Sequence, residues 1–83
     1  MTDQPHPPEN LQPGSWAEAE VDAMEGRRVR RRDGAAGTIT AAAGLIGRDG
    51  AVFQYAVQIQ WLHADKITYT KGDFENGAFE LLP

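Results

Sequence analysis

The sequence contains no cysteine, which excludes disulfide bonds, thiolate nucleophiles and cysteine-ligated zinc sites. It has no apolar run close to the roughly 20 residues of a membrane-spanning helix, and its first ten residues lack the basic and apolar regions of a secretion signal. We therefore expect a cytoplasmic protein with no membrane partner and no metal. Eighty-three residues allow one domain, which buries only about 60% of the surface of its unfolded chain. A deep catalytic cleft within one copy is not expected.

Positive charge is absent from the first 26 residues, which contain six acids and no lysine or arginine. The other 57 residues contain eight cations and six acids, a net charge of +2, and five of the cations lie within residues 27–32. An acidic segment thus precedes a basic one, and mutual attraction is the simplest explanation of this pattern.

Four of the five prolines lie in residues 1–14, where Leu11 is the only sizeable apolar residue after the first methionine. Such a segment buries too little surface to offset its ordering entropy, so we predict a disordered, Pro-rich tail. His6 lies in this tail, far in the chain from His63, and the two histidines predict no metal site.

Residues 15–25 have the pattern of a short acidic helix. Ser15 and the glutamate three residues later fit a capping box, and Val21 and Met24 continue an apolar stripe. Alanines and acids also alternate here as in a strand, but both residue types favour helices. Trp16 is either a staple that holds this helix onto the domain, which we prefer, or an exposed anchor for a partner.

From residue 26 onward, apolar and polar residues alternate as in β-strands. In Phe53–Trp61, five bulky apolar residues alternate with glutamine and alanine, so that one face is core and the other polar. Further strands are predicted at 28–30, 37–43, 66–70 and 79–81, with a mobile loop at 44–50 and one helical turn at 71–77. Residues 26–83 are therefore predicted to form a mainly β domain, a five-stranded antiparallel barrel that is closed or nearly closed.

The arginines of the first predicted strand are the most conspicuous candidates for binding. Arg28, Arg30 and Arg31 would bind phosphates of nucleic acid or of a nucleotide cofactor, because guanidinium binds phosphate in a bidentate fork. The alternative, which we prefer, is that they are solvated or paired within the domain, where the acidic helix just before them offers partners. A net charge of −4 and few aromatic residues outside the expected core make nucleic acid the weaker partner.

Other polar residues are weaker candidates for binding or catalysis. Gln58 and Gln60 lie on the polar face of the longest predicted strand, which is either simply solvated or would bond a ligand or a second subunit. His63 and Asp65 are interpreted as solvated turn residues, because no third group is placed to orient the imidazole as a catalytic base.

The stretch Met24–Ile39 has a Gly-x-x-Val strand, a glycine turn and Gly-x-Ile, and it is similar to the first hairpin of SH3-like barrels, a fold that includes KOW and Tudor modules. Its basic strand, the Ala-Ala pair after the turn and the Tyr55–Val57 segment also resemble the plasmid-borne type II dihydrofolate reductases. That narrower resemblance implies a homotetramer of SH3-like barrels whose single pore holds NADPH and dihydrofolate together.

The resemblance to these reductases places Arg31 where the family has a pore lysine and Tyr69 at the tyrosine of the family's Val-Gln-Ile-Tyr strand. Ile67 stands at the position of the family's glutamine, and a guanidinium keeps the charge of a lysine but not its shape. The resemblance therefore supports the expected fold more strongly than it supports reductase activity.

Three hypotheses follow. The first is a non-catalytic SH3-like module that recognises a protein or nucleic-acid partner through a barrel face and the Arg-rich strand. The second is an NADPH-dependent, reductase-like homotetramer, and the third is a small effector, encoded by a mobile genetic element, that blocks a host protein. Self-association is expected in all three, because so small a barrel gains stability from a partner surface. The expected binding residues are Arg28, Arg30, Arg31, Gln58, Gln60 and Tyr69.

Overall fold

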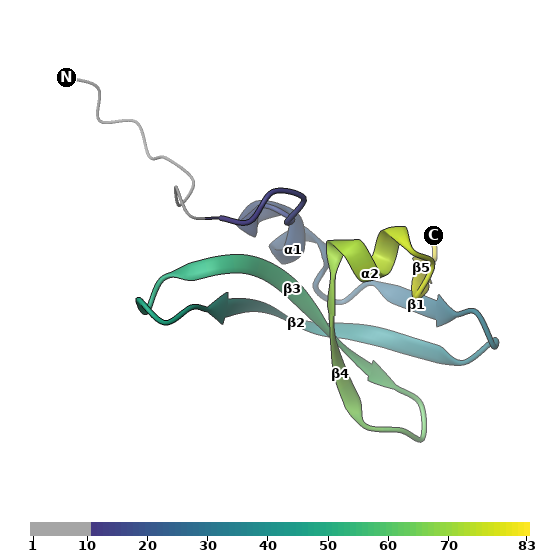
Figure 1. Ribbon diagram of the computed structural model, residues 1–83. Helices are drawn as coiled ribbons and strands as arrows, with labels where there is room; N and C mark the ends of the chain where they lie inside the picture. The colour runs from purple at the N-terminus through teal and green to yellow at the C-terminus, as the bar shows by residue number, and fades with distance from the viewer. Residues whose placement is uncertain (1–10) are drawn as a thin grey trace.

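The computed structural model describes residues 11–83, which form five strands and two short helices (Figure 1). The elements are, in chain order, α1 (Glu18–Met24), β1 (Arg28–Arg31), β2 (Ala36–Ile46), β3 (Val52–Trp61), β4 (Lys66–Thr70), α2 (Lys71–Glu75) and β5 (Phe79–Leu81). The mainly β fold and the short N-terminal helix predicted from the sequence are confirmed. His6 and most of the predicted tail lie outside the described residues.

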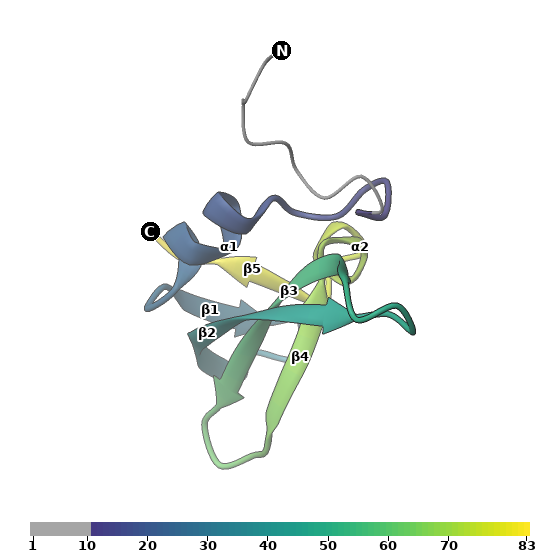
Figure 2. The same cartoon turned by 90° about the vertical axis from the view of Figure 1, so that its left-hand side faces the viewer.

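The five strands make one antiparallel sheet in the order β4-β3-β2-β1-β5. It curls into a half-barrel (Figure 2), so the predicted closure is not reached: within residues 11–83 the edge strands β4 and β5 share no ladder. The segment α2 lies between them in the chain, and side chains fill the gap. The ring of Phe79 on β5 lies 5.4 Å from that of Tyr69 on β4 and 5.1 Å from that of Phe74 on α2.

The core lies on the inner face of this half-barrel. Alternation along β3 buries Val57, Ile59 and Trp61 there, as predicted, and Tyr55 packs against them. Phe53 is half-buried on the part of the β2–β3 hairpin beyond the core cluster. Burying one large apolar side chain contributes about 1.5–3 kcal/mol, so this short run supplies much of the stability. The rest of the buried cluster consists of Trp16, Val21, Met24, Val29, Ile39 and Phe79.

The strand β2 is longer than the alternation predicted. Residues 44–46, expected in a mobile loop because of their glycine, continue the ladder, with Gly44 opposite Tyr55. A Cβ at position 44 would lie 3.1 Å from Val52 Cγ2, so the glycine makes room for the neighbouring strand. The loop is correspondingly shorter, running from Gly47 to Ala51.

The N-terminal segment docks on the sheet before α1 begins. Ser15, predicted to cap the helix, instead accepts a hydrogen bond through Oγ from the backbone N–H of Tyr55, at 3.0 Å. The Ncap position is Ala17, whose N–H donates to Glu20 Oε1 at 2.8 Å. The prediction was wrong at this residue because an unpaired strand N–H competes for the hydroxyl. Gln12, expected in the disordered tail, also joins β3 by donating its N–H to the Phe53 carbonyl at 2.6 Å.

Trp16 forms an isolated bridge with Tyr55 and is only 5% exposed. Its ring centroid lies 6.0 Å from that of Phe74. Trp16 is therefore the staple that the sequence favoured, although it precedes the helix rather than lying on it.

Candidate functional site

The strand β1 divides its arginines between the two faces of the sheet. Val29 is fully buried on the inner face, so Arg28 and Arg30 lie on the outer face and Arg31 lies on the same side as Val29. Neighbouring arginines thus meet different surroundings, although the sequence presents them as one run.

Two of these arginines are paired within the domain. Arg30 Nη2 lies 2.6 Å from Glu80 Oε1 on the adjacent β5, and Arg31 forms a bidentate pair with Asp33, at 2.9 and 3.0 Å. Pairing within the domain is confirmed for these two arginines, but their partners are not those of the acidic helix: among residues 11–83, no ion pair joins the acids of α1 to the arginines. The reason is geometric, because α1 packs on the inner face while Arg28 and Arg30 point outward.

The pair with Arg31 lowers the pKa of Asp33 from its ordinary value of 3.8, and the N–H of Ala35, donating to Asp33 Oδ1 at 3.0 Å, lowers it further. The same carboxylate raises the pKa of Arg31. Both groups are therefore charged at neutral pH, and they hold the β1–β2 turn, where Gly34 adopts a φ of +91°.

Arg31 and Tyr69, the residues carried over from the reductase resemblance, meet around one indole ring. The Arg31 guanidinium lies 4.9 Å from the centroid of Trp61, and Trp61 Nε1 donates to Tyr69 Oη at 3.0 Å. Trp61 is 1% exposed and Tyr69 is half-buried. In one copy, these three groups therefore contact one another, and the Arg31 side chain stays 34% exposed.

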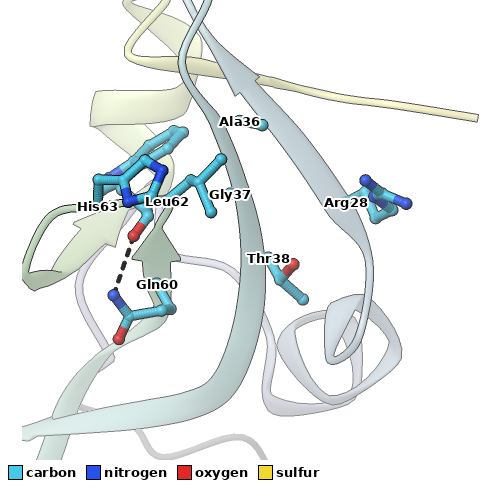
Figure 3. A pocket seen from close by; sticks show the side chains of 8 residues that line it. Arg28, Ala36, Gly37, Thr38, Gln60, Leu62 and His63 are labelled. Carbon is cyan, nitrogen blue, oxygen red and sulfur yellow. Dashed lines mark hydrogen bonds between the residues drawn. The ribbon is translucent and has the colours of Figure 1, made fainter.

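The outer face carries an open groove that we call the Arg28 groove (Figure 3). It has a volume of about 410 Å³ and lies across β1, β2 and the end of β3. Register explains its composition, because Arg28 pairs with Thr38 and Thr38 pairs with Gln60. The lining residues are Arg28, Ala36, Gly37, Thr38, Gln60, Trp61, Leu62 and His63.

Charge and apolar surface meet in the Arg28 groove. Within residues 11–83, Arg28 makes no side-chain hydrogen bond or ion pair, whereas Arg30 beside it is balanced by Glu80. Leu62 is 65% exposed, and His63 follows it in a left-handed conformation with a φ of +63°. The groove thus combines a free cation with an exposed apolar side chain.

The two glutamines predicted as binding residues differ in their hydrogen bonds. Gln60 bends back over the β3–β4 turn, where its Nε2 donates to the carbonyls of Trp61 and Ala64, at 3.0 and 2.6 Å (Figure 3 draws the first). Gln58 is half-buried on the outer face, and its backbone carbonyl accepts from Thr40 Oγ1 at 3.3 Å. Gln60 therefore shapes the groove wall and can offer a ligand only its Oε1.

Leu62 is the groove residue that sequence reasoning missed. It continues the strand alternation on the polar side and comes directly before the turn residues His63–Asp65. A large apolar side chain at a position where the period demands a polar one was the signal that could have identified it.

Residues 11–83 gather no group of three or more histidine, aspartate or glutamate side chains that could hold a metal ion. Over the same residues, neither helix has the length and apolar character needed to cross a membrane. Comparisons with models of protein families, with curated proteins and with solved structures find no match to this chain.

Proposed function

We propose that this protein is a non-catalytic binding module of the small SH3-like barrel kind, and that its Arg28 groove holds an acidic segment of a partner protein. The fold assignment is supported by five short antiparallel strands with a single helical turn before the last. The cap of that turn agrees with the sequence: Thr70 Oγ1 accepts from the Asp73 N–H at 3.2 Å, and Asp73 Oδ2 accepts from the Thr70 N–H at 2.9 Å.

The single observation that carries the function is that the unpaired Arg28 and the exposed Leu62 line the same groove. A carboxylate of the partner would pair with the guanidinium, and an apolar side chain of the partner would cover Leu62. Each contact alone is weak at a surface, but an apolar anchor next to a charged contact is a common basis of peptide recognition.

The geometry of the groove fits nucleic acid less well than a protein segment. Single strands bind by stacking their bases on exposed aromatic rings, whereas Trp16, Trp61 and Phe79 are buried in the core. The guanidiniums of Arg30 and Arg31 already have carboxylate partners. A protein segment that needs one carboxylate contact and one apolar contact fits the groove better than a chain of phosphates.

The contacts of Arg31 and Tyr69 do not favour the reductase-like hypothesis. Arg31 lies over the Trp61 ring, and Tyr69 accepts a hydrogen bond from the Trp61 indole. A pore built by four chains requires a tetramer, so a mass near 9.1 kDa, or twice that, would exclude it. NADPH oxidation in the presence of dihydrofolate would support it.

The experiment is a selection from a displayed peptide library on the immobilised full chain, followed by titration of the enriched peptides. Arg28→Ala and Leu62→Ala should each weaken binding by about tenfold. Arg32→Ala makes the same charge change, and Ile46→Ala the same kind of apolar truncation at another exposed position; both controls should stay within about twofold of the wild type.

Equal losses for Arg28→Ala and Arg32→Ala would mean that only net charge matters, and the groove would not be the site. No enrichment of peptides, together with Arg28-dependent binding of a labelled oligonucleotide, would replace the protein partner with nucleic acid.

A further inference from the structure

The distal half of β2 has a ladder partner on only one side. β1 pairs with residues 36–38. Just before β1, the Gly26 N–H donates to the Ile39 carbonyl, and the Ile39 N–H donates to the Arg27 carbonyl. Residues 41–45 pair with β3 alone; within residues 11–83 no other segment forms backbone bonds with them. In Figure 1 this half of β2 extends past the end of β1, with no strand along its other side.

The other sheet edges carry the features by which proteins discourage further pairing. The edge strand β4 begins with Lys66 and is followed by Lys71, while β5 has only three residues and is followed by Pro83. Residues 34–47, by contrast, contain no charged residue and no proline. Charges, prolines and short length normally protect an edge, so the distal half of β2 is the one open to another strand.

The side chains of this stretch are complementary to themselves. Register shifts between Ile39 and Ala41 and between Leu45 and Ile46 leave five regular residues, Ala41–Leu45. If two such strands met antiparallel about a two-fold axis at Ala43, Ala41 would lie opposite Leu45 and Ala42 opposite Gly44. Both Ala41–Leu45 pairs and the Ala43 pair would lie on one face, and the Ala42–Gly44 pairs on the other. No pair would contain two large side chains, which allows close approach.

We propose that residues 41–45 pair edge to edge with the same residues of a second copy, which makes a two-fold dimer with one continuous sheet. The self-complementary register and the lack of any charge that would select a different partner favour a second copy over a strand of another protein. Because five ladder residues bury less than a standard interface, the dimer belongs to the weak, concentration-dependent class.

The experiment measures the mass of the full chain by sedimentation between about 10 µM and 1 mM, the range suited to so small an interface. Ala43→Lys and Ala43→Glu each place like charges opposite one another at the two-fold axis, and each should weaken the dimer by about tenfold. An equimolar mixture of the two variants should restore it, because lysine then faces glutamate. Thr68→Lys and Thr68→Glu, on the exposed outer face of β4, are matched controls that should dimerise like the wild type.

Hydrogen exchange of the amides of residues 41–45 supplies a second readout, which should slow as the protein concentration rises. A wild-type chain that stays monomeric at the highest concentration would overturn the proposal. So would Ala43 variants that dimerise like the wild type, or a mixture that fails to restore the dimer. Circular dichroism confirms that each variant is folded, and since the readout is mass, the result is independent of whether the Arg28 groove binds a peptide.

Discussion

The inner and outer faces of the same sheet have different roles. The inner face is apolar and aromatic, and Trp16, Val21 and Phe74 cover it from the N-terminal segment, α1 and α2 (Figure 1). The outer face carries alanine, threonine, glutamine and arginine, and within residues 11–83 neither helix packs on it. The large buried side chains therefore lie on the inner face, and the outer face carries the Arg28 groove.

Replacing the largest inner side chain tests this division most severely. Trp61→Ala removes a buried ring together with its contacts to Arg31 and Tyr69, and it should lower the free energy of unfolding by about 3–5 kcal/mol in urea denaturation. Ile59→Val, a milder change in the same core, should cost about 0.5–1.5 kcal/mol. Thr68→Ala on the outer face should change stability by less than about 0.5 kcal/mol. A comparable loss from the outer-face variant would contradict the division.

Adding a single methyl group on the inner face is the next largest change. A Cβ at Gly37 would lie 2.6 Å from Trp61 Cε3 and 2.9 Å from Ile59 Cγ2. Gly37→Ala should therefore lower the free energy of unfolding by about 1–3 kcal/mol, measured by thermal and urea denaturation. Gly72→Ala in α2 is the control, because its Cβ would meet only Thr70 Oγ1 at 3.7 Å. Wild-type stability of Gly37→Ala would show that the indole can move aside.

One hydroxyl group contributes to the attachment of the N-terminal segment. Ser15→Ala leaves the Tyr55 N–H without its acceptor, and it should cost about 1 kcal/mol with faster hydrogen exchange at the Tyr55 amide. Ser15→Thr keeps the hydroxyl and should preserve that protection. If the amide exchanges at the same rate in Ser15→Ala, water has replaced the hydroxyl, and Trp16 and the Gln12 N–H hold the segment without it.

The smallest expected effect concerns pH. The pKa of Asp33 is lower in the folded chain than its ordinary value, so its pair with Arg31 stabilises the fold above that value and is lost as the pH falls below about 4. The stability difference between the wild type and Asp33→Asn should be constant above about pH 5 and shrink toward zero in acid. Chemical denaturation at pH 7 and at pH 3 measures this, and an unchanged difference would show that the charge of Asp33 does not cause it.

Local pattern was enough to place most elements but not their ends. The alternation in residues 66–70 gave β4 with its observed bounds, because each residue there has a clear preference for one face. Gly44 and Ser15 were assigned wrongly, because glycine is common in loops and serine is common at helix caps. In the structure Gly44 lies opposite Tyr55 in the ladder, and the Ser15 hydroxyl accepts from the Tyr55 N–H.

The candidate site was less predictable than the fold. Arg28, Arg30 and Arg31 are equivalent in the sequence, and only the positions of Glu80 and Asp33 distinguish the free one from the paired ones. The groove also needs Thr38, which register places beside Arg28, and Leu62, which comes from the turn after β3.

The amino-acid sequence by itself determined the strands, their order along the chain and the face of β3 that becomes the core, because these depend on residues one or two positions apart. The tertiary structure alone decided that the sheet stays a half-barrel, which of Arg28, Arg30 and Arg31 remains unpaired and which edge of β2 is left open. Those properties arise from contacts between residues far apart in the chain, and no local periodicity records such contacts.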